Sequence, residues 1–302
     1  MNKFLDTLAG KLAERWLALL VLPGALYVAV AIAAIRLSHV RWYRVDLLRH
    51  DLARLASEPA ARSPGTIALA LAGLLAAAAV AGILNQSLGS LFRGLWFASS
   101  RGPLTRALTR RRARRWDTAE QRFREVIVAA GEAQLAGEPG TAGLIRRAEE
   151  LAAARNAIGL VRPTRPFAAG DRMAAADRRV LDRYALDLTS AWPRLWLALP
   201  DTTRSALQVA HGAVAAAQRL AGWAIAYLLL TVVWWPAVLI AVVCLVVAWR
   251  RAASAAGTLA DLVEAAVDLH GRALARSLGV RSPGPLDRQT GAEITALLRK
   301  GT

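Results

Sequence analysis

Cysteine, lysine and histidine are scarce in this chain of 302 residues, which has one cysteine, three lysines and four histidines. The single cysteine, Cys244, excludes a framework of intramolecular disulfides and a cysteine-rich zinc site. The histidines share no metal-ligand spacing with one another or with the carboxylates, so we expect no metal site. They are His39, His50, His211 and His270.

Motifs for catalysis are lacking as well. The sequence has no glycine-rich phosphate loop followed by a lysine, and no Gly-x-Ser-x-Gly elbow that would present a nucleophilic serine. The lone thiol lies within an apolar run, where a thiolate is disfavoured. The sequence therefore predicts no catalytic residue and no bound cofactor, and we expect a protein that is not an enzyme.

Hydrophobic residues, by contrast, make up 55% of the chain, and the mean hydropathy is +0.33. Soluble chains are usually about 45–50% apolar. The excess collects in three runs without Asp, Glu, Lys, Arg or His, Trp16–Ile35, Thr66–Phe92 and Leu220–Trp249. Coupled transporters place ionisable groups at membrane depth, so coupled transport is not favoured. Because no alternating strand pattern appears either, we expect an all-α integral membrane protein.

The first two runs predict full transmembrane helices, over residues 16–35 and 66–92. Twenty residues at 1.5 Å per residue cover about 30 Å, which is the thickness of the bilayer core. The second run has small or polar residues at four-residue spacing, which places them on one helical face and lets another helix approach closely. This helix-packing face consists of Gly73, Ala77, Ala81, Asn85 and Gly89.

The third run, residues 220–249, allows two interpretations. A single kinked helix would reach about 45 Å and would leave two tryptophans near the bilayer centre, although tryptophan prefers the interface. The alternative is a short membrane hairpin of two limbs, because a proline interrupts the helical hydrogen bonds between them. Its membrane hinge would be Trp234, Trp235 and Pro236.

The distribution of positive charge favours the hairpin. The net charge is +17, and residues 93–115 carry eight arginines and no acid. Arginine-rich segments stay in the cytoplasm, so we expect this segment and the amino terminus inside and residues 37–65 outside. Arg250 and Arg251 also favour the cytoplasm, which requires the third run to return to the side that it left. The five arginines in residues 37–65 oppose this assignment.

The arginine-rich segment is also a candidate surface for the anionic lipids of the bilayer. Each cationic side chain close to an anionic leaflet contributes about 1 kcal/mol. Nucleic acid is not an expected partner, because no recognition motif is present and few aromatic side chains accompany the arginines. The candidate lipid-binding residues are Arg101, Arg106, Arg110, Arg111, Arg112, Arg114 and Arg115.

The segments outside the runs have the patterns of helices. Residues 1–15 predict an interfacial amphipathic helix, and the outer loop at 37–65 contains another. Residues 116–219 are long enough for a cytoplasmic helical domain, and residues 250–302 form a cytoplasmic tail with an amphipathic helix near 257–278. A Gly-Glu-Pro-Gly breaker and an extended Arg-Pro-Thr-Arg-Pro linker divide the domain. Its expected helices span residues 120–135, 141–157 and 171–188.

Three motifs stand out in and after this domain: Arg-Tyr-Ala-Leu-Asp-Leu at 183–188, Trp-Pro-Arg-Leu-Trp at 192–196 and Trp-Trp-Pro at 234–236. Together with Arg-Pro-Thr at 162–164 they resemble a group of actinobacterial polytopic membrane proteins. The resemblance covers residues 160–250 best and implies a bacterial plasma membrane, but it carries no known activity. The two tryptophans at 192 and 196 belong either in the core of the domain or in the headgroup layer.

These observations predict a non-enzymatic scaffold or adaptor of the bacterial plasma membrane, which presents its helical domain to an unidentified cytoplasmic protein. The alternative is a homo-oligomeric membrane pore or channel, such as a stress or defence effector, assembled through the helix-packing face. We expect a homo-oligomer in either case. A pore should lose its assembly when Ala77 and Ala81 become leucine, whereas an adaptor should lose its partner when residues 171–199 are disrupted.

Overall fold

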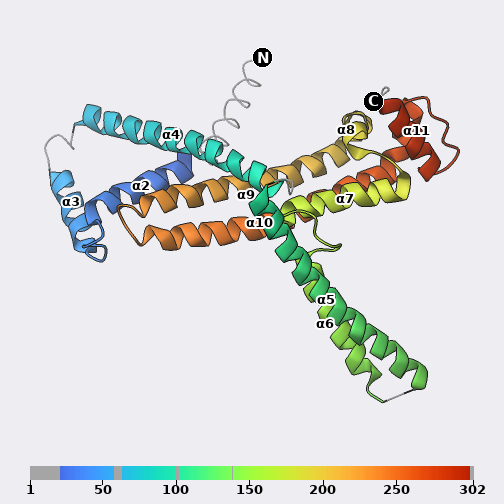
Figure 1. Ribbon diagram of the computed structural model, residues 1–302. Coiled ribbons are helices and arrows are strands. Elements are labelled where there is room, and N and C mark those ends of the chain that lie inside the picture. Colours follow the sequence, from blue (N-terminus) through green and yellow to red (C-terminus); the bar gives the residue numbers. More distant parts are fainter. Residues whose placement is uncertain (1–20, 58–62, 99–101, 138, 300–302) are drawn as a thin grey trace. The chain divides into compact units, whose positions relative to one another are not determined.

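The computed structural model describes residues 21–57, 63–98, 102–137 and 139–299. Within these ranges every regular element is an α-helix and none is a β-strand, which confirms the all-α prediction. The expected interfacial helix at residues 1–15 lies outside the described residues. The helices, in chain order (Figure 1), are α2 (Leu22–Leu37), α3 (Val45–Ser57), α4 (Pro64–Trp96), α5 (Pro103–Ala136), α6 (Thr141–Ile158), α7 (Ala168–Tyr184), α8 (Leu188–Ala198), α9 (Asp201–Leu230), α10 (Ala237–Ser277) and α11 (Arg288–Leu298).

Three of the described helices, α4, α9 and α10, are long and apolar enough to cross a membrane. The second uncharged run lies within α4, and the third is shared between α9 and α10. The first run contributes α2, an apolar helix of 16 residues; residues 16–20 of that expected span lie outside the described residues. These helices support the interpretation of the chain as a helical membrane protein.

The chain divides into two compact units. The first unit combines the described residues up to Arg93 with Ala216–Trp249. The second unit combines Gly94–Ala215 with the residues from Arg250 onward. Both α9 and α10 therefore contribute residues to each unit.

In the first unit, glycine and alanine let the helices approach closely. A Cβ atom on Gly24 of α2 would collide with the backbone of Ala78 in α4. A Cβ atom on Gly222 of α9 would lie 2.8 Å from the carbonyl oxygen of Asn85 in α4. Close backbone approach through small residues is typical of helices packed in a membrane. The buried apolar core of this unit consists of Ala34, Trp223, Ala226, Tyr227, Leu230, Ala237 and Ala241.

The third uncharged run is interrupted at the expected hinge. The helix α9 ends at Leu230, α10 begins at Ala237, and residues 231–236 form the turn between them. Pro236 immediately precedes α10, where its missing N–H removes no helical hydrogen bond. Both helices contribute to the apolar core of the first unit, so they pack against each other there (Figure 1).

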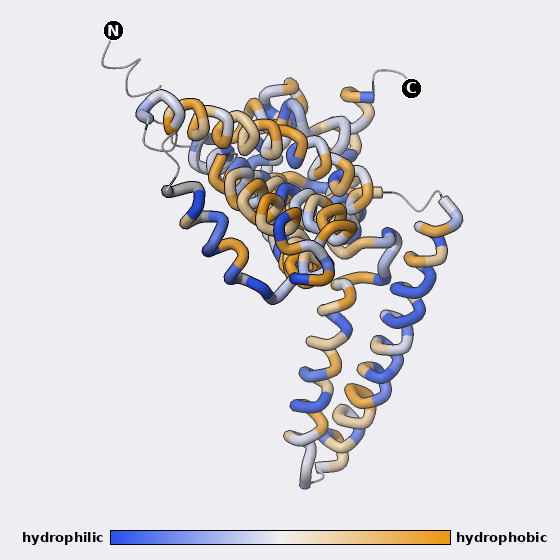
Figure 2. Tube along the Cα trace, turned by 90° about the vertical axis from the view of Figure 1, so that its left-hand side faces the viewer, coloured by the Kyte–Doolittle hydropathy of each residue, from blue (hydrophilic) through white to orange (hydrophobic). Residues whose placement is uncertain are grey.

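In the second unit, α5 and α6 form an antiparallel pair. The chain reverses at the predicted Gly-Glu-Pro-Gly breaker, where Gly137 and Gly140 have φ angles of 66° and 112°, which favour glycine. Across the pair, Arg155 donates to Glu120 at 2.8 Å and lies 4.8 Å from the ring centroid of Phe123. Figure 2 shows hydrophilic residues recurring along these two helices. Polar contacts, as well as apolar ones, therefore join the pair.

The other helices of the second unit surround one hydrophobic core. It receives side chains from α7, α8 and α11 and from the parts of α9 and α10 that belong to this unit. Two polar contacts fasten α7 to α10: Arg179 donates to Glu264 at 2.6 Å, and the hydroxyl of Tyr184 donates to Asp268 at 2.7 Å. The fully buried side chains include Leu186, Leu195, Leu207, Leu274 and Ile294.

The helix expected at 171–188 is α7, but it is shorter than expected at its carboxyl end. It ends at Tyr184, because Ala185 adopts the left-handed backbone conformation with φ of 51°. Asp187 then caps α8 by accepting a hydrogen bond from the backbone N–H of Thr189. The prediction was wrong here because the apolar spacing continues across this break.

The tail also differs from the prediction. The amphipathic helix expected near 257–278 is not a separate element but the second half of α10, which runs without interruption for 41 residues from Ala237. No proline lies between Trp249 and Gly257 to end the helix at the end of the apolar run. The last helix, α11, was not predicted; Asp287 caps it by accepting a hydrogen bond from the backbone N–H of Thr290.

Candidate functional site

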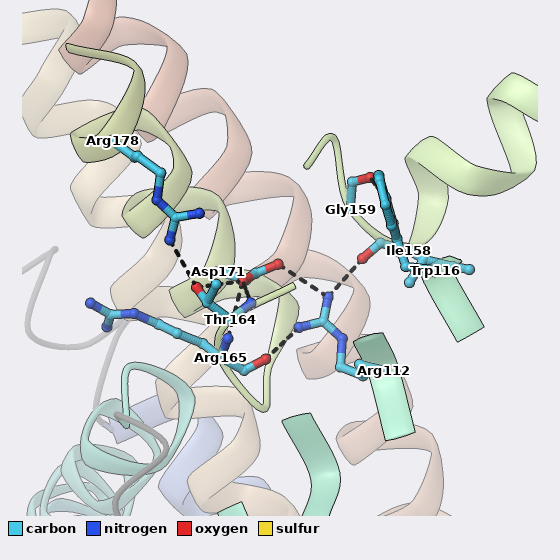
Figure 3. A network of polar contacts seen from close by, with 8 residues as sticks. All are labelled: Arg112, Trp116, Ile158, Gly159, Thr164, Arg165, Asp171 and Arg178. Carbon is cyan, nitrogen blue, oxygen red and sulfur yellow. Dashed lines mark hydrogen bonds and ion pairs between the residues drawn. The ribbon is translucent and has the colours of Figure 1, made fainter. Parts of the chain in front are cut away.

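A network of polar contacts in the second unit joins α5, α7 and the linker between α6 and α7 (Figure 3). At its centre, a guanidinium nitrogen of Arg112 lies 3.6 Å from the carboxylate of Asp171. The same guanidinium donates to the carbonyl oxygens of Ile158, at 2.6 Å, and Arg165, at 2.8 Å. Burial lowers the pKa of Arg112, and Asp171 is only 5% exposed. Loss of either charged partner would leave the other buried and uncompensated.

Asp171 also holds the linker itself. Its carboxylate accepts hydrogen bonds from the backbone N–H of Thr164, at 2.8 Å, and of Arg165, at 3.1 Å. The indole N–H of Trp116 in α5 donates to the carbonyl oxygen of Gly159 at 2.8 Å. The linker predicted from the Arg-Pro-Thr-Arg-Pro sequence is therefore bonded to α5 and α7, which fixes the rotational position of α5 against it.

The predicted lipid-binding arginines do not form one set. Arg101 lies outside the described residues. Arg112 is directed into the polar network, where its guanidinium is occupied, so we remove it from the candidates for lipid contact. The other five are exposed on α5: Arg106, Arg110, Arg111, Arg114 and Arg115.

Three of these exposed arginines share one face of α5. Arg106, Arg110 and Arg114 line a groove of about 370 Å³ together with Arg162 of the linker. The guanidinium of Arg162 donates to both carboxylate oxygens of Asp117, at 2.8 and 3.0 Å. This contact lowers the pKa of Asp117 and raises that of Arg162. The groove is called the basic groove below.

A second groove in the same unit, of about 900 Å³, is lined mainly by apolar side chains of α7, α8, α9 and α10. The ring centroids of Trp192 and Trp196 in α8 lie 6.0 Å apart along it. Both tryptophans are half-buried and pack against the hydrophobic core. On the same helix, Leu195 is fully buried, whereas Leu197 is 77% exposed. The Trp-Pro-Arg-Leu-Trp motif thus belongs to the core of the unit and also forms a wall of this apolar groove.

Four polar side chains also line the apolar groove: those of Asp177, Thr189, Gln208 and His211. Although the side chain of Asp177 reaches solvent, burial by its surroundings raises its pKa. Among the described residues no three His, Cys, Asp or Glu side chains gather as metal ligands would. An apolar lining with a few polar groups is typical of a binding site for an apolar or amphipathic ligand.

The carboxyl-terminal half of the helix-packing face on α4 contacts α9 of the same chain. Asn85 is 3% exposed, and its amide donates to the carbonyl oxygen of Arg219 at 3.1 Å. A Cβ atom on Gly89 would lie 3.0 Å from the carbonyl oxygen of Gln218. This half of the predicted face therefore has its partner helix within the first unit.

The amino-terminal half of the face is not covered in the same way. Ala81 packs partly against the core of the first unit. Gly73 and Ala77 are exposed, and a Cβ atom on Gly73 would meet no described atom within 4 Å. A second helix could approach this part of α4 without a clash.

The predicted hinge residues, Trp234, Trp235 and Pro236, lie in the turn between α9 and α10. The backbone N–H of Trp235 donates to Nδ1 of His39 at 3.2 Å, and Nε2 of His39 lies 2.8 Å from a carbonyl oxygen of the same turn. The indole of Trp235 meets that of Trp42 at 5.0 Å between centroids. The turn is thus bonded to the segment that follows α2.

The contacts of two residues, His39 and Asp171, were not predicted from the sequence. His39 has no neighbouring residue pattern that would have indicated its contact with a distant turn. Asp171 had a usable signal, because it lies in the first turn of a predicted helix, just after a proline-rich linker whose backbone N–H groups need acceptors.

Comparison of the chain with protein-family models, with curated proteins and with solved structures gives no match.

Proposed function

We propose that this chain is a non-enzymatic adaptor of a bacterial plasma membrane. In this proposal the first unit anchors the chain in the bilayer, and the second unit binds an amphipathic helix of a cytoplasmic partner protein. The observation that carries the proposal is the apolar groove of about 900 Å³ in the second unit. Exposed apolar surfaces of this kind mark sites of interaction.

A helix suits the apolar groove better than an extended peptide. An extended peptide that binds by strand addition needs the edge of a sheet, and the described residues contain no strand. A helix pairs its own backbone groups and needs only an apolar face. Trp192, Trp196 and Met173 line the groove; tryptophans act as anchors of interfaces, and methionine adapts to different surfaces. Asp177 at the groove favours a basic residue on the partner.

The proposed membrane arrangement has two full spans and a short hairpin. The spans are the run ending in α2 and the helix α4, and the hairpin is formed by residues 220–249 with its turn on the outer side. The contacts of His39 support this arrangement, because they bring the hairpin turn to the segment that follows α2. The arginine-rich segment after α4 and Arg250 after the apolar part of α10 would then both be cytoplasmic.

Site-specific photo-crosslinking tests the adaptor proposal. A photoreactive residue at Leu197, which is 77% exposed at the apolar groove, should give one defined protein adduct in cells. The same residue at Leu135, which is 92% exposed in α5, is the control and should not give it. The adduct should disappear when Trp192 and Trp196 are replaced by alanine. Identical adducts at both positions, or no adduct at Leu197, would contradict the proposal.

A homo-oligomeric pore is the second candidate, favoured by one observation: Gly73 and Ala77 of α4 are exposed and leave room for another helix. In a pore, this part of α4 would contact α4 of a second copy. Replacing Ala77 and Ala81 by leucine should then dissociate the assembly and abolish ion flux through liposomes. An adaptor with the same substitutions should keep its groove adduct.

A further inference from the structure

The basic groove of the second unit concentrates positive charge that the protein itself does not neutralise. Four arginines, at positions 106, 110, 114 and 162, line it, and the nearby carboxylate is that of Asp117, which is bonded to Arg162. Three positive charges of the groove therefore lack a carboxylate partner among the described residues. Since Arg106, Arg110 and Arg114 follow one another at four-residue spacing, they repel each other along the helix.

The arrangement is held in place rather than being a chance alignment of mobile side chains. Arg112 and Trp116 bind the carbonyl oxygens of the linker from the neighbouring face of α5. Asp171 binds the backbone N–H groups of the same linker. Together these contacts determine that the face carrying Arg106, Arg110 and Arg114 is the one that meets Arg162. The repulsion is thus built into the fold, which is typical of a site that binds an anion.

The chemistry of the groove fits a phosphate group. The planar guanidinium donates through two parallel N–H groups, which match two oxygens of a phosphate, and several arginines can share its three outer oxygens. Thr109 and Thr164 also line the groove, although their hydroxyls already donate within the chain, to the carbonyl oxygen of Thr105 and to the carboxylate of Asp171. Its volume, about 370 Å³, is within the range of small-ligand sites. No aromatic side chain lines it, so it offers nothing on which a nucleobase could stack.

The position of the groove in the chain indicates where the phosphate comes from. Arg106 follows Trp96, the last residue of the candidate span α4, by only ten residues. Ten residues reach at most about 36 Å when fully extended. Basic residues this close to the end of a span lie near the headgroups of the adjoining leaflet. We propose that the basic groove binds the phosphate of an anionic lipid headgroup at the surface of the same membrane.

Titration of the purified full-length chain with lipid in a mild detergent tests this proposal. The retained lipid is counted by native mass spectrometry, with phosphatidylglycerol as the anionic lipid and phosphatidylcholine as the neutral one. The groove variant carries Arg106→Gln, Arg110→Gln and Arg114→Gln. The matched control carries Arg111→Gln, Arg115→Gln and Arg122→Gln, which removes the same charge from exposed positions of α5 that do not line the groove.

The groove variant should lose about fivefold in phosphatidylglycerol affinity for each arginine removed, or on the order of 100-fold in total. The control variant should lose far less, and phosphatidylcholine should bind all forms alike. A variant with lysine at the three groove positions keeps the charge but loses the paired N–H groups, so its affinity should lie between those of the unaltered chain and the glutamine variant. Equal losses in the groove and control variants would overturn the proposal, because the attraction would then be diffuse.

Two further measurements separate lipid from free phosphate and a binding defect from a folding defect. Inorganic phosphate, added without lipid, should raise the thermal unfolding midpoint far less than phosphatidylglycerol does. A rise with inorganic phosphate alone, and none with the lipid, would overturn the lipid assignment. Without anionic lipid, the groove variant should unfold no earlier than the unaltered chain, because its glutamines relieve the repulsion. Earlier unfolding would mean that the arginines serve the fold, and it would also overturn the proposal.

Discussion

At the scale of single residues, the second unit depends on a charged pair formed between distant parts of the chain. Arg112 and Asp171 bond three backbone groups of the linker and the carbonyl oxygen of Ile158 at the end of α6, as well as each other. The mutual attraction of such a pair contributes little net stability, but removing one partner is costly because the other charge is then buried without compensation. Each partner keeps the other, and the linker backbone, from being buried without a hydrogen bond.

We therefore expect Asp171→Ala to lower the free energy of unfolding by about 3 kcal/mol, since it leaves the charge of a half-buried guanidinium uncompensated and two linker N–H groups unpaired. The control is Glu150→Ala, which removes an ion pair with Arg147 whose two side chains are 64% and 61% exposed. That change should cost about 0.5 kcal/mol or less. Denaturant unfolding in detergent, followed by tryptophan fluorescence, measures both. Equal effects of the two substitutions would mean that the network does not stabilise the unit.

At the scale of helices, interruptions at glycine or proline were easier to predict from the sequence than the continuation of a helix beyond its apolar run. The breaks at Gly137–Gly140 and at Trp234–Pro236 could be predicted because glycine and proline act locally on the backbone. The break after Tyr184 was missed, since Ala185 in a left-handed conformation has no sequence signature. The length of α10 was missed because its apolar run and its amphipathic continuation have different patterns on one uninterrupted helix.

The candidate sites were predictable only where they depend on nearby residues. The arginine-rich segment is visible in the sequence, so the exposed arginines of α5 were identified as candidates. Arg112 was grouped with them, although its guanidinium binds carbonyl oxygens of the chain itself. The apolar groove needs side chains from α7, α8, α9 and α10. No spacing rule brings such distant segments together, so only the Trp192–Trp196 wall of the groove was noticed.

Close packing between α4 and α9 gives a prediction at this scale. A Cβ atom on Gly222 would lie 2.8 Å from the carbonyl oxygen of Asn85, whereas one on Gly212 of the same helix would meet no described atom within 4 Å. Gly222→Ala should therefore lower the thermal unfolding midpoint, because the two backbones must separate. Gly212→Ala should leave the midpoint unchanged or raise it, because alanine is more favourable in a helix than glycine by up to about 1 kcal/mol. A midpoint unaffected by Gly222→Ala would contradict the close approach.

At the scale of the whole molecule, the proposed arrangement would put the turn of the hairpin outside the membrane and the second unit inside. In a Cys244→Ser chain, a single cysteine introduced at Val232, which is 78% exposed, should react with a membrane-impermeant maleimide on intact cells. A single cysteine at Leu135 should react only after lysis. Labelling of both positions, or of Leu135 alone, on intact cells would contradict the proposed orientation.

The central claim is that the chain works as an adaptor and not as a subunit of a pore. The most direct measurement is the mass of the complex extracted in a mild detergent, with the bound detergent and lipid accounted for. An adaptor needs no closed ring, so the adaptor proposal predicts a dimer at most, which is the smallest homo-oligomer. A ring of four or more copies would contradict it. The few apolar helices of one chain cannot enclose a water path, whereas those of several copies together can.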